Sequence, residues 1–270
     1  MNKIKKLFSV LQQVSKNPSL FNLILNRNEN WRENFHKKYG HSNFLPLINL
    51  NQLSENEVFE IPFYSFLGGG SLPTDLILLR TLCQRFSECN YFEIGTWRGE
   101  SAINMADVCE TCYTLNLSKE EFEVLGLSKE YIEAQAVLSK NNSRITHLEG
   151  DSKKFDFAAL NKKFDVIFID GNHEYDFVLS DTKKVFEHLV HANSIVVWHD
   201  YAYSPENIRY EVYKAILDAI PSSNHENLFH VANTMCAIYI NKNLKTKELK
   251  TPVNPEYLFN VKIKPLKINL

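Results

Sequence analysis

The chain has 270 residues, which suits one ordinary domain with additions or two small domains. Hydrophobic residues make up 44% of it, enough to build a substantial core. The formal net charge of -2 at pH 7 excludes the strongly basic surface of a general nucleic-acid-binding protein, so we expect no nucleic-acid partner.

Residues 1–65 are expected to form an N-terminal helical appendage. Its start places Lys3, Lys5 and Lys6 beside apolar side chains, the pattern of an amphipathic helix. Such a helix can lie on a membrane surface. We favour the alternative that it packs on its own domain or on a partner subunit. In the second case the N-terminal helices would form a homodimer. Three consecutive glycines at 68–70 then predict a flexible join.

Helices and strands are expected to alternate after this join. A helix with one apolar face, at 74–86, leads into the first strand. The last two strands, 227–231 and 235–240, are joined by three residues only, which requires an antiparallel hairpin. The five strands expected before the hairpin are 90–94, 112–117, 144–148, 164–170 and 193–198. The helices expected among them are 100–108, 118–140, 177–190 and 206–220.

The alternation predicts an α/β fold: a Rossmann-like, doubly wound and mostly parallel sheet of seven strands with a C-terminal antiparallel hairpin. The strand at 164–170 is almost continuously apolar, as buried parallel strands are. The ligand-binding domain would span 66–245. Residues 246–270 would form an extended tail on the surface.

The stretch 91–101 is the most informative in the chain. It predicts a buried strand, a tight turn with two glycines, and the first turn of a helix. Gly95 and Gly99 carry no Cβ, so backbone N–H groups can approach a ligand closely. This arrangement is typical of the nucleotide-binding corner of a doubly wound sheet. As the alternative, the two glycines serve only the packing of the helix against the strand.

The cysteines and the hydropathy of the chain indicate a cytoplasmic protein. No secretory signal precedes the cysteines, so we expect reduced thiols. Cys109 and Cys112 form a lone C-x-x-C without the second pair or the histidines that zinc would need, so we expect buried core side chains. No apolar run approaches the ~20 residues that span a bilayer, so we expect no stable membrane span.

Three motifs, in the right order, resemble those of the class I S-adenosylmethionine-dependent methyltransferases over residues 74–240. Residues 93–99 are similar to the E-x-G-x-x-x-G loop of that family. Residues 169–175 are similar to the I-D-G-x-H-x-Y motif of one subgroup, and 199–201 to the H-D-Y that ends its fifth strand. The resemblance implies S-adenosylmethionine as the cofactor and methylation of a hydroxyl on a small-molecule or sugar acceptor.

The same resemblance implies a set of cofactor contacts. The glycine turn would face the methionine part of the cofactor. Asn116 stands where the family places an acidic residue for the ribose hydroxyls; it lacks the charge that strengthens such a bond, and it can equally be a turn residue. Asp151 would accept from the adenine amine, cap a helix, or do both. The expected set is Glu93, Gly95, Thr96, Trp97, Gly99, Asn116, Gly150, Asp151, Ser152 and Asp170.

The fourth and fifth strands are followed by residues that can carry the chemistry. Neighbouring strands lie about 4.8 Å apart, so Asp170, His173, His199 and Asp200 should meet beside the reacting methyl group. The catalytic candidates are Asp170, His173 and His199. Either a side chain acts as general base, or a divalent cation on Asp170, His199 and Asp200 lowers the pKa of the hydroxyl. These ligands suit Mg²⁺ or Mn²⁺. As the alternative, the histidines only hydrogen-bond within their loops.

Two rival functions stay open at this point. A nicotinamide-dependent (NAD-type) oxidoreductase can use a related sheet, but the chain lacks G-x-G-x-x-G and ends its sheet in a hairpin. A non-catalytic nucleotide-binding module with a degenerate cofactor site is compatible with Asn116.

Overall fold

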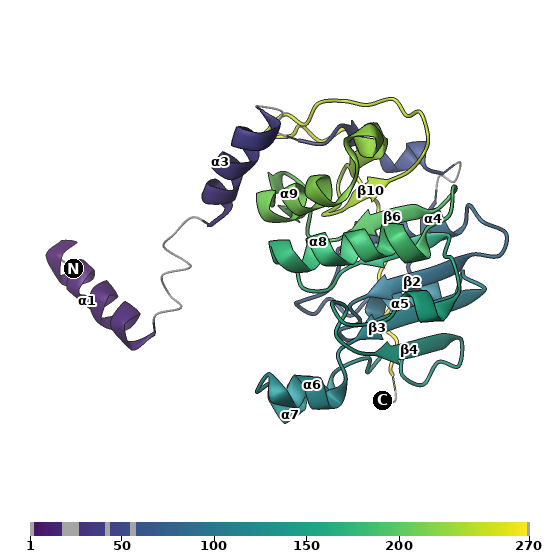
Figure 1. Cartoon of the computed structure of the whole chain (residues 1–270), viewed down its shortest axis with the longest axis horizontal. Coiled ribbons are helices and arrows are strands. Elements are labelled where there is room, and N and C mark those ends of the chain that lie inside the picture. Colours follow the sequence, from purple (N-terminus) through teal and green to yellow (C-terminus); the bar gives the residue numbers. More distant parts are fainter. Residues whose placement is uncertain (1–2, 18–26, 41–43, 55–57, 269–270) are drawn as a thin grey trace. The chain divides into compact units, whose positions relative to one another are not determined.

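The computed structural model describes residues 3–17, 27–40, 44–54 and 58–268. The chain divides into two compact units, Met1–Asn43 and Phe44–Leu270. Among its described residues, the first unit holds the helices α1 (Lys3–Lys16) and α3 (Arg27–Tyr39) (Figure 1).

The second unit contains the sheet and the helices that flank it. Its longer helices are α4 (Pro73–Cys83), α8 (Tyr175–Lys184) and α9 (Tyr210–Ala219), and its shorter ones are α5 (Glu100–Met105), α6 (Lys119–Val124) and α7 (Lys129–Glu133). The strands are β1 (Leu47–Ile48), β2 (Asn90–Ile94), β3 (Thr111–Asn116), β4 (Ile145–Glu149), β5 (Val166–Ile169), β6 (Ile195–Trp198), β7 (Ala202–Ser204), β8 (Asn207–Ile208), β9 (Leu228–Val231) and β10 (Ala237–Tyr239).

The main sheet has the strand order β1-β9-β10-β6-β5-β2-β3-β4. Its strands pair in parallel, except that β10 is antiparallel to both β6 and β9. The doubly wound, mostly parallel sheet and its closing hairpin are therefore confirmed.

The sheet has eight strands, where the sequence predicted seven. The additional strand is β1, which pairs in parallel with β9 through Leu47 opposite His230. Two residues are too few to show a strand pattern, and tertiary hydrogen bonds make this strand: the His230 N–H donates to the Pro46 carbonyl at 2.9 Å. The helical appendage expected over residues 1–65 thus includes a segment, from residue 44 onward, that belongs to the second unit.

Strand β2 lies at the centre of the sheet, between β3 and β5. The chain winds outward from β2 to β4 and then returns to the other side of β2 as β5. The strand order therefore reverses between the carboxyl ends of β2 and β5, the place where doubly wound sheets bind their ligands.

Helices cover both faces of this sheet, so its central strands are buried throughout. On one face, Tyr91, Phe168 and Val197 share a core with α4 and α5. On the other face, the Trp198 ring stacks on Phe186, and its Nε1 donates to Thr182 Oγ1 of α8 at 2.9 Å. In Figure 1, α8 and α9 run side by side in front of the sheet.

Two segments depart from regular α/β alternation. The helix expected at 206–220 begins at Tyr210 instead, because β7 and β8 form a separate two-stranded ribbon before it. Residues 251–268 carry no helix or strand. This stretch contacts the main body through Asn49 Nδ2, which donates to Glu256, and Asn51 Nδ2, which donates to the Tyr257 hydroxyl.

Candidate active site

Glu93 occupies the end of the central strand and is completely buried. Its Oε2 accepts from the Tyr91 hydroxyl at 2.7 Å, whereas its Oε1 has no hydrogen-bond partner in the structure. Burial raises the pKa of this carboxyl to about 8, although hydrogen bonds from Tyr91 and Ser101 oppose the rise. A buried carboxyl with one unused oxygen is costly, which indicates a role other than packing.

Gly95 and Gly99 both have positive φ angles, 94° and 79°. A Cβ on Gly95 would overlap the carbonyl oxygen of Asp170, and a Cβ on Gly99 would overlap the hydroxyl of Ser139. Both glycines are therefore needed for close packing, as the alternative interpretation of the sequence expected. At Gly95 this packing has a functional consequence, since the missing Cβ lets the end of β2 touch the loop that carries Asp170.

Two more side chains of this turn each have a buried polar atom without a hydrogen-bond partner. Thr96 Oγ1 and Trp97 Nε1 have no partner, in the same way as Glu93 Oε1. The Trp97 ring packs on Tyr131 with 4.6 Å between centroids, so the indole is held in place. Three orphaned polar atoms on one turn fit a polar ligand such as the methionine part of S-adenosylmethionine. These residues are therefore the ones suited to hold it.

The ends of β3 and β4 lie next to each other. Asn116 Nδ2 donates to Gln135 Oε1 at 3.0 Å, and the Asn116 carbonyl accepts from the Gly150 N–H at 2.8 Å. Asp151 Oδ1 accepts from the Lys153 N–H at 2.9 Å, but residues 152–154 form a turn and not a helix. The expected helix cap is therefore wrong, because the side chain caps this turn instead. Both side chains thus already have a structural partner at the expected ribose and adenine positions.

Asp170, His199 and Asp200 converge at the ends of β5 and β6. His199 Nδ1 lies 3.0 Å from Asp170 Oδ1 and 3.3 Å from Asp200 Oδ2. His173 sits at the rim with its side chain 48% exposed, and its Nδ1 is 3.4 Å from Asp200 Oδ2. The structure therefore brings together all four residues that the sequence placed here.

Asp75 is a member of this cluster that the sequence did not reveal. It lies in the first turn of α4, is completely buried, and accepts from His199 Nε2 at 3.2 Å. Its two oxygens also accept from the N–H groups of Leu72 at 2.7 Å and Met235 at 2.9 Å. In the sequence, an Asp at the start of a helix indicates only a cap, and 124 residues separate it from His199.

The cluster holds His199 between carboxylates on both ring nitrogens. Burial disfavours its imidazolium form, but Asp170 and the hydrogen bonds to Asp200 and Asp75 outweigh burial and raise the pKa of His199 well above its usual range. Burial alone would raise the pKa of Asp200. Hydrogen bonds from His173 and His199 outweigh burial and lower this pKa. Burial raises the pKa of Asp170. The carboxylates on both ring nitrogens favour the imidazolium form of His199, which makes it a poor proton acceptor.

The same atoms could also hold a metal ion. One ligand atom each from Asp170, His199 and Asp200 lies within 4.8 Å of the others. Two carboxylate oxygens and one imidazole nitrogen fit Mg²⁺ or Mn²⁺ acceptably, provided that His199 Nδ1 gives up its proton. A hollow of about 10 Å³ borders these residues.

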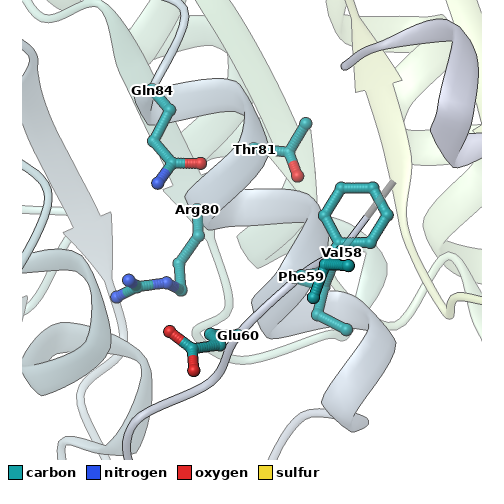
Figure 2. Close-up of a pocket in the computed structure, with 7 residues that line it drawn as sticks. Val58, Phe59, Glu60, Arg80, Thr81 and Gln84 are labelled. Carbon is teal, nitrogen blue, oxygen red and sulfur yellow. The ribbon is translucent and has the colours of Figure 1, made fainter. Parts of the chain in front are cut away.

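A larger cavity of about 200 Å³ lies away from this edge. It is bordered by Glu60, by Arg80 and by other residues of the second half of α4 (Figure 2). Arg80 is already engaged, since it donates to the Asn104 carbonyl at 2.7 Å and to Asp107 at 3.0 Å. No residue of the glycine turn or the cluster lines this cavity, so we place the active site at the carboxyl edge despite the difference in size.

The cysteines group differently from the C-x-x-C pattern. Cys109 lies with Cys83 and Cys89, their sulfurs within 4.8 Å of one another, and Cys112 is not in this group. All five cysteines are buried thiols. The expectation of buried core side chains is confirmed, whereas their reduced state stays a prediction.

The chain was compared with known protein families and structures, and part of it matches a family model. Residues 92–201 match the model of the family described as "Methyltransferase domain". No curated protein matches the chain.

Several solved methyltransferases are similar to the chain. The SAH-bound methyltransferase PaMTH1 of Podospora anserina has 18% identity and a TM-score of 0.44, covering 64% of this chain and 80% of that chain. The TDP-rhamnose 3'-O-methyltransferase CalS11 of calicheamicin biosynthesis has 14% identity and a TM-score of 0.43, covering 63% and 80%. The MycE methyltransferase, in complex with Mg, SAH and mycinamycin VI, has 20% identity and a TM-score of 0.42, covering 78% and 57%.

The family match begins inside the central strand and ends with the H-D-Y that follows β6, so it contains both the glycine turn and the acidic cluster. From β2 to the residues that follow β6, this chain is therefore similar to the methyltransferase domain family.

Proposed function

We propose that the chain methylates a hydroxyl group of a small-molecule or sugar acceptor, and that the acceptor binds over the Asp170–His199–Asp200 cluster. One observation carries the proposal: these groups converge directly beside the glycine turn, where Gly95 contacts the Asp170 carbonyl. In the reaction the acceptor oxygen forms a bond to the methyl carbon, the carbon–sulfur bond breaks, and the hydroxyl proton leaves to a base.

His173 is our candidate for that base. Its ring lies at the rim, where an acceptor can reach it, and Asp200 lies beside Nδ1. With Nδ1–H donated to Asp200, Nε2 is the nitrogen that can accept the proton. His199 has carboxylates at both nitrogens, so we assign it a positioning role rather than that of a base.

A divalent cation on Asp170, His199 and Asp200 is the second part of the proposal. A bound Mg²⁺ or Mn²⁺ would lower the pKa of the acceptor hydroxyl. Asp75 would then keep the proton on His199 Nε2 and leave Nδ1 to face the ion, the arrangement in which a carboxylate orients a metal-bound histidine.

For the cofactor we propose the set predicted from the resemblance. Glu93, Thr96 and Trp97 have the unused polar atoms to hold its methionine part. Asn116, Gly150, Asp151, Ser152 and Asp170 would line the remainder, and Asn116 would have to share its amide between Gln135 and the ribose. A homodimer through the N-terminal helices stays a prediction, as does a cytoplasmic location.

Calorimetry and thermal shift test these assignments. The protein should bind S-adenosylhomocysteine and not NAD, and Mn²⁺ should raise its melting temperature. Asp170→Asn should abolish the Mn²⁺ shift, whereas Asp176→Asn, a change at an exposed aspartate of α8, should retain it. Binding of NAD alone would overturn the methyltransferase proposal. A Mn²⁺ shift that survives Asp170→Asn would overturn the metal site and leave His173 as the sole activating group.

A further inference from the structure

Helix α1 combines exposed apolar side chains with a polar face whose only charges are positive. Its 14 residues include Lys3, Lys5, Lys6 and Lys16 and no Asp or Glu. The whole chain has a net charge of -2, so positive charge is concentrated in this helix against the overall balance. A basic amphipathic helix of this composition is typical of segments that bind membrane surfaces.

The apolar residues of α1 form one stripe. Leu7, Val10, Leu11 and Val14 follow the i, i+3, i+4, i+7 spacing of a single helix face. Leu7 is 59%, Phe8 69% and Leu11 54% exposed, whereas Val14, at the end of the stripe, is buried. Large apolar side chains gathered on one exposed face are costly in water, which indicates that something covers them.

We propose that α1 lies in the surface of an anionic lipid membrane. Leu7, Phe8 and Leu11 would insert among the lipid headgroups, and the lysines would lie over the lipid phosphates. At about 1.5 Å per residue the helix is roughly 21 Å long, shorter than the ~30 Å hydrocarbon core, so it lies on the bilayer. Within the part of the chain that the structure describes, no helix combines the length and apolar content needed to cross a membrane.

The charges favour a lipid surface over a second copy of the same helix. Two α1 helices packed face to face would bring lysines together with no acidic residue on either helix to pair with them. Helix α3 differs from α1 in this respect, because it contains acidic residues and its Arg32 forms an ion pair with Glu29 of the same helix. Negative lipid headgroups would pair with the lysines of α1, which has no acidic residue of its own.

Co-sedimentation of the full chain with vesicles tests this. The protein should bind vesicles of equal parts phosphatidylglycerol and phosphatidylcholine, and bind phosphatidylcholine alone at least tenfold more weakly. Lys5→Gln and Lys6→Gln should each weaken binding about fivefold, and added salt should weaken it further. Leu7→Gln with Leu11→Gln should abolish binding while keeping the charge and the helix propensity of α1.

Ser9→Ala with Gln13→Ala is the matched control, because these residues lie on the opposite face of α1 and should leave binding unchanged. Absence of binding to anionic vesicles, or equal binding by the Leu7/Leu11 variant, would overturn the proposal. So would a dimer in sedimentation velocity that the Leu7/Leu11 variant converts to monomer while vesicle binding is absent. Binding of S-adenosylhomocysteine should be the same in all these variants, so this test and that of the methyltransferase site can fail separately.

Discussion

The glycine turn and the acidic cluster lie at the ends of adjacent strands, yet their polar atoms are satisfied in opposite ways. At the turn, Glu93 Oε1, Thr96 Oγ1 and Trp97 Nε1 are buried without partners. At the cluster, each ring nitrogen of His199 meets at least one carboxylate. The first region carries unused hydrogen-bonding capacity, whereas the imidazole of the second is already paired with carboxylates.

This difference suits the glycine turn to ligand binding and the acidic cluster to the chemical step. A ligand at the turn gains hydrogen bonds that the protein alone leaves unmade, so the turn favours binding. An ion at the cluster must instead displace a proton from His199, so metal binding there depends on pH and on the residues that orient the imidazole. Substitutions in each region test this difference between the turn and the cluster.

Gly95→Ala should cause the largest loss. The new Cβ would overlap the Asp170 carbonyl oxygen at a φ of 94°, so the ends of β2 and β5 would have to separate. We expect the free energy of unfolding to fall by about 4 kcal/mol in urea titrations. Gly126→Ala is the control: its φ is 74° but nothing lies within 4 Å of the Cβ, so it should cost about 1 kcal/mol. Equal losses would show that the two strand ends need no contact.

Asp75→Asn should be next in size. It leaves the buried His199 with one carboxylate fewer, and removing one partner of a buried ion pair costs about 3 kcal/mol. The same urea titration measures the loss, and NMR of the His199 ring should report a lower pKa for the imidazolium. An unchanged His199 pKa would contradict the pairing of His199 with Asp75.

Glu93→Gln should change how stability depends on pH. The pKa of Glu93 is about 8 in the folded chain against 4.5 for an ordinary glutamate, so between these limits the folded state binds the extra proton. Stability must therefore fall as pH rises, by about 1.4 kcal/mol from pH 6 to pH 7 for this one group. Urea titrations at several pH values should show that Glu93→Gln removes this slope relative to the unchanged chain. Parallel profiles would mean that Glu93 ionises normally.

Asn116→Asp should give the smallest effect. A carboxylate makes a stronger, charge-assisted bond to a ribose hydroxyl than an amide does, so S-adenosylhomocysteine should bind about fivefold more tightly in calorimetry. Asn116→Ala, which removes both the amide and its bond to Gln135, should not tighten binding. If the Asp variant binds no better, Asn116 acts as a turn residue rather than as a ribose contact.

Much of the site could be read from local sequence patterns. The glycine turn, the two acidic strand ends and the closing hairpin are each encoded in a few consecutive residues, and parallel pairing brings the strand ends together without further information. Strand β1 and residue Asp75 could not be found this way. A two-residue strand has no periodicity, and an aspartate in the first turn of a helix has an ordinary capping explanation.

By itself, the sequence determined the α/β class, the doubly wound sheet with its closing hairpin, and the residues that gather at the carboxyl edge, because these follow from periodicity and the rules of parallel connections. Only the tertiary structure decided how those residues are used. Burial and long-range contacts left Glu93, Thr96 and Trp97 with orphaned polar atoms, and they surrounded His199 with carboxylates from three different segments. Desolvation and pairing are properties of the packed chain, so no local pattern carries them.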